Sequence, residues 1–292
     1  MKKWCECKIE VKKGNQKILE NFLSNYQFCS YSVYQKSFSR KAEIRAFIPF
    51  SKRKKFLQEL YSAIELIPII SKDPSTPTIH VSFKKNDEYT DEWKRYFKPL
   101  KIGRFVIKPT WEEWKAKKGE LVLEMDPGMA FGTGQHFTTC YCIKLLQKYS
   151  LKGLDFIDVG CGSGILSIVA EKLKAKTITG LDISRSAVNT SKENFKKNCT
   201  SKNAEFKCMR LERMSLEKDF DLVVANLTDT VIVNNAFILK SLVRNNGILI
   251  LTGIRFKKMS TVISLFKDLQ ILDSSNDSIL EWGGCAFRKT AK

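Results

Sequence analysis

The sequence Asp155-Phe-Ile-Asp-Val-Gly-Cys-Gly-Ser-Gly164 decides the fold of the larger part of this 292-residue chain. Residues 155–159 form a short apolar run that ends at a glycine, which is typical of a buried parallel strand. Residues 165–173 have helical periodicity, and residues 177–181 are strand-like again. The order strand, glycine-rich turn, helix, strand predicts a parallel α/β sheet.

Polar and glycine residues stand where these two strands end. Gly160, Gly162 and Gly164 follow the first strand, and Asp182 ends the second, 18 residues after Gly164. Ligands bind open α/β sheets at the carboxyl ends of strands, and glycine lets the backbone approach them closely. An acid at this place can accept both hydroxyls of a ribose. The stretch therefore predicts a site for a cofactor that contains a nucleoside.

The spacing of the glycines separates the cofactor classes. A dinucleotide fingerprint reads G-x-G-x-x-G, but Ile165 occupies the place of its last glycine, and no lysine follows in P-loop spacing. The pattern G-x-G-x-G, with Asp158 two residues before the first glycine, resembles the S-adenosylmethionine site of Rossmann-like methyltransferases. A dinucleotide site and a purely structural glycine turn are the alternatives.

The chain is strongly basic, with a formal net charge of +19. Residues 1–85 carry 17 Lys and Arg against 7 Asp and Glu, so about half of the excess lies in under a third of the chain. Such a field attracts acidic partners, nucleic acid included. A lysine-rich solvated surface with no specific partner is an equally good interpretation, because no basic run alternates with aromatic residues in a known binding pattern.

Composition also excludes several classes of protein. No run of 18 apolar residues is present, so no membrane span is expected. Charges recur within the first ten residues, which argues against a signal peptide and for a cytoplasmic protein. The nine cysteines form no C-x-x-C pair and there are two histidines, so no metal site is expected.

The first 85 residues predict a small α+β domain. The expected strands cover residues 4–11, 30–38, 42–50 and 78–84, and the expected helices cover 15–26 and 54–67. Pro68 is expected to end the second helix. The order β-α-β-β-α-β is typical of a ferredoxin-like fold.

Two further segments lie between this domain and the glycine turn. Residues 86–125 form an aromatic-rich linker, which we interpret as a packing belt rather than a ligand cage. Residues 126–136 form a glycine-rich loop, and Thr138 and Thr139 begin an apolar helix after it. Such a loop can lie over a bound cofactor; a long connection with a good helix cap is the other interpretation.

Three blocks of sequence carry a resemblance to a known family. They are Trp93-Lys-Arg-Tyr-Phe-Lys-Pro99 with Pro109-Thr-Trp111; Asp126-Pro-Gly-Met-Ala-Phe-Gly-Thr-Gly-Gln-His136 with Thr138-Thr139; and residues 158–168 with Asp182-Ile183 and Val224-Ala-Asn-Leu227. Together they resemble the bacterial ribosomal protein L-eleven methyltransferases, class I S-adenosylmethionine-dependent enzymes. The resemblance covers residues 93–292, whereas the amino-terminal domain agrees in size, position and order of elements only.

The resemblance implies an architecture and an activity. It implies a Rossmann-like, seven-stranded α/β domain over residues 126–292 that binds S-adenosylmethionine, preceded by a ferredoxin-like substrate-recognition domain over residues 1–85. Residues 86–125 would link the two and begin the catalytic domain. The activity implied is methyl transfer to lysine or amino-terminal amines of a large-subunit ribosomal protein, with S-adenosylhomocysteine as product. A cytoplasmic monomer that works near ribosomal RNA is expected.

The same resemblance implies individual site residues. The expected cofactor contacts are Thr139, Gly160, Gly162, Gly164, Asp182, Asn226, Phe131 and Gly132. Asn226 would also orient the target amine. His136 is a candidate for assisting proton loss, although a hydrogen bond that orders the loop is the favoured role for it.

The chain departs from the family pattern at two places. Gln135-His136-Phe137 stands where the family usually has Thr followed by His-Pro, and Leu227-Thr228-Asp229 stands where it usually has Ile-Leu-Ala. The second departure adjoins the expected place of the amine, so it bears on substrate choice and on activity. Two alternatives follow: a methyltransferase for another protein lysine or a small amine, and a non-catalytic protein that binds RNA or the ribosome.

Overall fold

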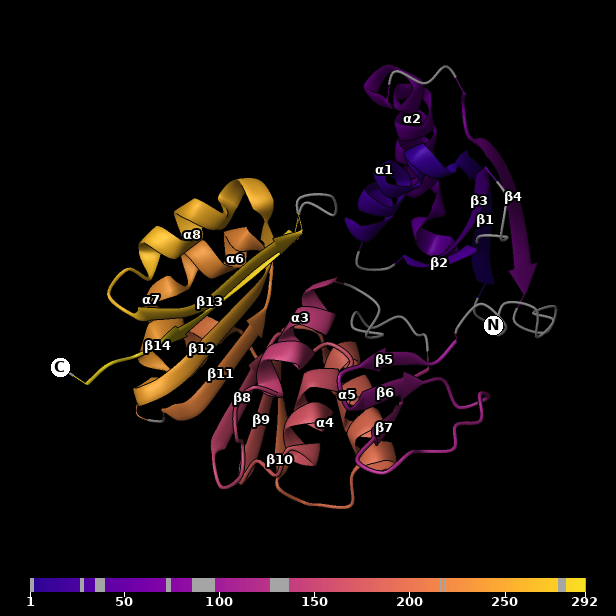
Figure 1. The fold of residues 1–292 in the computed structure, drawn as a ribbon. Helices are drawn as coiled ribbons and strands as arrows, with labels where there is room; N and C mark the ends of the chain where they lie inside the picture. The colour runs from indigo at the N-terminus through magenta and orange to yellow at the C-terminus, as the bar shows by residue number, and fades with distance from the viewer. Residues whose placement is uncertain are drawn as a thin grey trace. The chain divides into compact units, whose positions relative to one another are not determined.

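The computed structural model describes residues 3–26, 29–34, 40–71, 75–85, 98–126, 137–215, 217, 219–277 and 282–291. These residues form two compact units (Figure 1). Among the described residues, the first unit ends at Lys98 and the second begins at Pro99. None of the helices described has the length and apolar composition that crossing a lipid bilayer requires.

The first unit is a four-stranded antiparallel sheet with two helices. Its strands lie in the order β2-β3-β1-β4. The elements are β1 (Lys3–Lys12), α1 (Lys13–Ser24), β2 (Ser30–Tyr34), β3 (Lys41–Pro49), the 3-10 turn η1 (Phe50–Lys52), α2 (Arg53–Ser71) and β4 (Thr78–Lys85). The predicted β-α-β-β-α-β order is confirmed.

Apolar residues at alternate positions of the strands form the core of this unit. Cys5, Cys7 and Ile9 point to one face of β1, where they are fully buried together with Leu19 of α1 and Phe56 of α2. Both cysteines are free thiols. They act here as small apolar residues, as their spacing on a strand predicts.

The prediction that Pro68 ends the second helix is wrong, because α2 continues to Ser71. A proline inside a helix removes one backbone hydrogen bond. Burial of Ile64 and Ile67 against the sheet stabilises the helix on the preceding turn, and the Ser71 hydroxyl donates to the Ile67 carbonyl at 2.7 Å. Tertiary packing therefore outweighs the local signal.

The second unit contains a seven-stranded sheet in the order β10-β9-β8-β11-β12-β14-β13, with β14 antiparallel to its neighbours and the others parallel. This arrangement confirms the predicted Rossmann-like class. A three-stranded sheet, β5 (Leu100–Ile102), β6 (Phe105–Lys108) and β7 (Leu121–Glu124), precedes it. The other elements are α3 (Phe137–Leu146), β8 (Asp155–Val159), α4 (Ile165–Lys172), β9 (Thr177–Asp182), α5 (Arg185–Asn198), β10 (Ala204–Cys208), η4 (Leu211–Arg213), β11 (Phe220–Asn226), α6 (Asp229–Asn234), α7 (Ala236–Ser241), β12 (Val243–Arg255), η5 (Phe256–Lys258), α8 (Met259–Leu265), β13 (Gln270–Asp277) and β14 (Trp282–Arg288).

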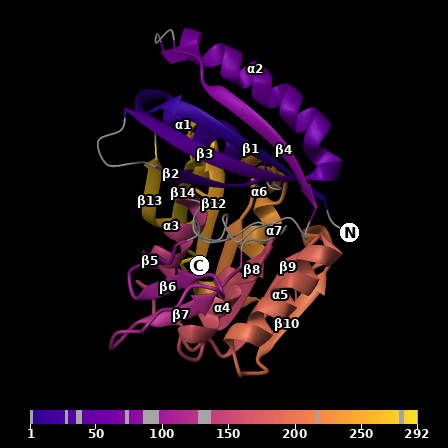
Figure 2. The ribbon, with the colours of Figure 1, turned by 90° about the vertical axis from the view of Figure 1, so that its right-hand side faces the viewer.

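Helices cover both faces of the large sheet. Phe156 and Leu222 belong to a core formed with α3, α4 and α5, whereas their neighbours Ile157 and Val223 belong to a second core with α6, α7 and α8. Figure 1 shows α6, α7 and α8 on one side of the sheet and α3 and α4 on the other, and Figure 2 shows the same unit turned by 90°. Since successive strand residues are buried on opposite faces, the strands read as continuous apolar runs.

The order of the strands places a site at the carboxyl edge of the sheet. From β8 the chain builds outward to β9 and β10, then returns to place β11 on the other side of β8. Such a reversal opens a crevice beyond the carboxyl ends of the adjacent strands, where ligands of doubly wound sheets bind.

We predict that Gly164→Ala destabilises this unit more than Gly153→Ala does. Both glycines have positive φ, 80° and 81°, so each alanine would carry a left-handed backbone at a cost of about 1–2 kcal/mol. A β-carbon at 164 would lie 3.0 Å from Cα of Ser191 in α5, whereas at 153 it would meet nothing within 4 Å. Thermal unfolding of the two variants measures the difference, and equal melting temperatures would show that α4 and α5 are not tightly packed at Gly164.

Candidate functional site

The glycine turn leaves β8 and folds back against β9. Gly160, Gly162 and Gly164 all have positive φ, between 53° and 80°. The backbone N–H groups of Gly160 and Cys161 both donate to the Leu181 carbonyl at 2.8 Å. The turn is therefore anchored to the strand that carries Asp182, and its alternating backbone requires glycines at these positions.

Asp182 is held in a fixed orientation at the end of β9. One carboxylate oxygen accepts a hydrogen bond from the Gly162 N–H at 3.0 Å, and the other accepts one from the Ser184 N–H at 2.8 Å. Ser184 in turn caps α5 by accepting from the Ala187 N–H at 3.3 Å. Each carboxylate oxygen has a further lone pair for a ligand hydroxyl. The acid is thus held in one orientation, with acceptor capacity left for the ribose hydroxyls that the sequence analysis expects there.

Asp158 is a buried acid beneath the glycine turn. Its Oδ2 accepts hydrogen bonds from the Ser167 N–H at 3.2 Å and the Ser167 hydroxyl at 2.8 Å. Its Oδ1 is buried and has no hydrogen-bond partner among the described residues. Burial raises the pKa of Asp158 to about 7; the nearby charge of Asp182 also raises this pKa, while the hydrogen bonds from Ser167 oppose the rise. An unpartnered buried carboxyl oxygen leaves a hydrogen-bonding group for a ligand at this place.

Asn226 and Thr139 approach each other from different elements. Asn226 is the last residue of β11, and Thr139 is buried in the first turn of α3. The Asn226 side-chain nitrogen donates to the Thr139 hydroxyl oxygen at 3.5 Å, the long limit for a hydrogen bond. This contact directs the Asn226 nitrogen toward α3 and leaves its oxygen as an acceptor.

The structure brings together six of the predicted site residues in the second unit. Gly162 contacts Asp182, Thr139 contacts Asn226, and Gly160 and Gly164 flank the same turn. The other three, Phe131, Gly132 and His136, lie outside the described residues. The functional roles of all nine stay predictions. No group of three or more His, Cys, Asp and Glu within the described ranges is placed to hold a metal ion.

Sequence reasoning missed the residues that shape the surroundings of this edge. Ile183 follows Asp182 directly and is 74% exposed, which is high for an isoleucine and places an apolar surface beside the acid. Leu227 lies against the turn, since a β-carbon on Gly160 would come within 2.4 Å of its side chain. Ile183 and Leu227 each follow a polar residue that ends a strand, Asp182 and Asn226 respectively. This pattern is the sequence signal that would have identified both.

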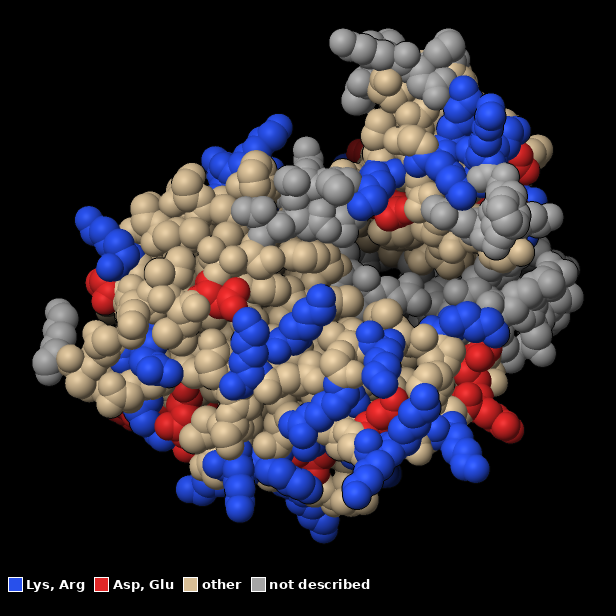
Figure 3. All heavy atoms as spheres, in the orientation of Figure 1, with Lys and Arg blue, Asp and Glu red and all other residues tan. Residues whose placement is uncertain are grey.

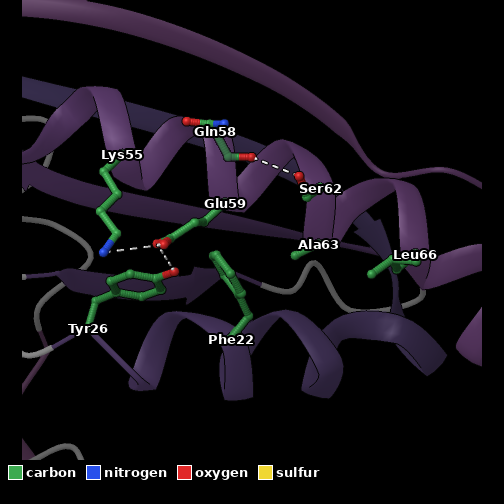
Figure 4. Close-up of a pocket in the computed structure, with 8 residues that line it drawn as sticks. All are labelled: Phe22, Tyr26, Lys55, Gln58, Glu59, Ser62, Ala63 and Leu66. Atoms are coloured by element: carbon green, nitrogen blue, oxygen red, sulfur yellow. Dashed lines mark hydrogen bonds and ion pairs between the residues drawn. The ribbon is translucent and has the colours of Figure 1, made fainter.

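The first unit has a pocket of its own (Figure 4). It has a volume of about 650 Å³ and is lined by Phe22, Tyr26, Lys55, Gln58, Glu59, Ser62, Ala63 and Leu66. The Tyr26 hydroxyl donates to Glu59 at 2.6 Å, and the Lys55 ammonium lies 3.8 Å from the same carboxylate. The Glu59 carboxylate is thus already paired from two sides.

We predict that the stability difference between Asp158→Asn and the native chain grows with pH. Unfolded Asp158 loses its proton near pH 3.8, whereas the folded protein retains it to about pH 7. The stabilising effect of this retained proton is complete below pH 4 and is lost as pH rises through 7. Asparagine does not titrate, so the variant should gain about 2–3 kcal/mol relative to the native chain between pH 5 and 8. Thermal unfolding across this range measures the gain, and a pH-independent difference would contradict an elevated pKa.

Comparison with known proteins agrees with the geometry of this edge. The family model described as ribosomal protein L11 methyltransferase (PrmA) matches residues 3–290. The ribosomal protein L11 methyltransferase of Dictyoglomus thermophilum is 42% identical over 187 residues, which cover 64% of this chain and 61% of that protein. The protein of the same name from Alkaliphilus oremlandii is 46% identical over 177 residues, covering 60% and 56%. These matches span less than two thirds of either relative.

Longer matches are found at lower identity. The ribosomal protein L11 methyltransferase of Caldicellulosiruptor bescii is 33% identical over 238 residues, covering 80% of this chain and 77% of that protein. The crystal structure of a ribosomal protein L11 methylase from Lactobacillus delbrueckii subsp. bulgaricus matches with a TM-score of 0.61 and 27% identity, covering 67% of this chain and 100% of that one. The match over residues 3–290 means that this chain belongs to the ribosomal protein L11 methyltransferase (PrmA) family.

Proposed function

We propose that this chain is an S-adenosylmethionine-dependent protein N-methyltransferase that modifies lysine or amino-terminal amines of ribosomal protein L11. The observation that carries the proposal is the carboxyl edge of the sheet, where Asp182 is held by the Gly162 N–H and Asn226 lies beside Thr139. Family membership agrees with this geometry.

The residues at this edge fit S-adenosylmethionine. Asp182 would accept the ribose hydroxyls, and exposed Ile183 would offer an apolar surface to the adenine. The unpartnered Oδ1 of Asp158 offers a buried hydrogen-bonding group beneath the glycine turn. When bound, the cofactor supplies an electrophilic methyl group on a sulfonium. Phe131 and Gly132 are proposed as further contacts, on the motif alone.

Asn226 would orient the amine that receives the methyl group. Since its nitrogen faces Thr139, its side-chain oxygen is the atom available to accept an amine N–H. The amine must be neutral to attack, and an unperturbed lysine has a pKa near 10.4, so desolvation at the site must favour proton loss. His136 is the candidate for assisting this proton loss, again on the motif alone, beside its favoured role of ordering the loop.

The first unit is proposed to recognise the ribosomal protein. We assign residues 1–85 to recognition, residues 86–125 to the linker and the start of the catalytic domain, and residues 126–292 to catalysis. Figure 3 shows Lys and Arg side chains over both units, with fewer Asp and Glu side chains interspersed among them. A basic surface of this kind suits work near ribosomal RNA. We further propose a cytoplasmic monomer.

We predict that Asp182→Ala weakens S-adenosylmethionine binding about 10- to 100-fold, the scale of a lost charge-assisted hydrogen bond. Titration calorimetry of the intact chain measures this. Asp219→Ala is the matched control, because Asp219 pairs with Arg244 before the opposite, amino end of β11. An unchanged affinity in Asp182→Ala would show that this acid does not hold the ribose.

We predict that the native chain adds methyl groups to purified ribosomal protein L11 in the presence of S-adenosylmethionine, and that Asn226→Ala lowers kcat at least 10-fold with a smaller effect on cofactor affinity. Mass spectrometry of L11 detects the product. Methylation of other proteins or small amines but not L11 would indicate a different substrate. RNA binding with no transfer to any amine would indicate a non-catalytic protein.

A further inference from the structure

The turn that connects β11 to α6, residues 226–229, is held along its length by the end of β12. We call it the β11–α6 turn. Its first residue, Asn226, pairs in register with Thr252, and the Leu227 N–H donates to the Thr252 carbonyl at 3.1 Å. Gly253 has a φ of 82°, and a β-carbon there would lie 2.3 Å from the Leu227 carbonyl oxygen. The backbone of β12 therefore presses directly against the turn.

An ion pair closes the other end of the turn. Arg255 donates from Nε to one oxygen of Asp229 at 3.0 Å and from Nη2 to the other at 2.8 Å. The Asp229 side chain is 5% exposed, whereas that of Arg255 is 56% exposed. This bidentate geometry fixes the direction as well as the distance between the two groups. The buried carboxylate of Asp229 would be strongly unfavourable without its cation. Loss of the Arg255 guanidinium would therefore drive the turn to rearrange.

The Asp229–Arg255 pair accounts for one of the two places where the sequence departs from the family pattern. By the resemblance, Asp229 stands where the family usually has alanine, and on sequence alone this departure bears on substrate choice and on activity. In the folded chain Arg255 supplies its partner, three residues after Thr252 on the strand that already holds Asn226. The charge of Asp229 is thus neutralised by Arg255, which lies on β12, the same strand that pairs with Asn226 at the start of the turn.

We propose that Asp229 and Arg255 are positioning residues that hold Asn226 in its orientation toward the target amine. The two residues between Asn226 and Asp229 leave little slack, so a fixed Asp229 limits the directions open to the Asn226 side chain. Asp182 ends β9 and Gly162 lies in the turn after β8, so the pair acts on the amine end of the site more than on the cofactor end. This inference rests on the proposed methyl transfer.

The test compares Asp229→Asn, Arg255→Met and the double variant Asp229→Ala/Arg255→Met in the intact chain. Each single variant should lower kcat on L11 about tenfold, equivalent to about 1.4 kcal/mol, with the Kd for S-adenosylmethionine changed less than about threefold. The double variant removes the unpaired carboxylate that Arg255→Met leaves buried, but it also lacks the ion pair. Its kcat should therefore exceed that of Arg255→Met and stay below that of the native chain. Asp219→Asn, which alters an Arg–Asp pair at the opposite edge, should leave kcat unchanged.

A second readout does not depend on the reaction. The side-chain amide resonance of Asn226 in a nitrogen–proton spectrum, assigned by its loss in Asn226→Ala, should shift in both single variants and stay in place in Asp219→Asn. An unmoved resonance, or unchanged kcat in variants that are folded at the assay temperature, would overturn the positioning role. A shifted resonance in a protein that methylates no L11 would support positioning and reject the proposed reaction instead.

Discussion

The hydrogen bonds that tie the glycine turn to β9 are the constraint on which the rest of the site depends. The turn must leave β8, pass over the end of β9 and enter α4, and both Gly160 and Cys161 donate to one carbonyl, that of Leu181. The next residue of β9 is Asp182, which accepts from Gly162 in return. The turn and the acid therefore hold each other, and neither can be placed without the other.

Buried charge is handled differently at the two ends of the edge. Asp158 lies beneath the turn without a cation, and burial raises its pKa to about 7. Asp229 is also buried but has a bidentate arginine partner. The first arrangement leaves a carboxyl oxygen without a protein partner among the described residues, and the second uses both carboxylate oxygens for hydrogen bonds within the fold. In the proposed site, the first would serve cofactor binding and the second would hold the turn that carries Asn226.

Much of this organisation is readable in the sequence because it is local. Strand, turn, helix and strand follow one another within residues 155–182, and the period of apolar residues identifies each of them. The order of elements in the first unit is equally readable from alternation. Pro68 is the instructive failure, since a strong local signal for a helix end is overridden by burial of Ile64 and Ile67 against a sheet that is distant in sequence.

The sequence by itself determined the two fold classes, the glycine turn, the acid at its partner strand and the family. These rest on short-range spacing and residue type, which the chain carries without reference to its fold. Only the tertiary structure decided which distant residues meet: Thr139 with Asn226, and Arg255 with Asp229. Such contacts depend on strand order and on the register between parallel strands, and no periodicity within one segment encodes either.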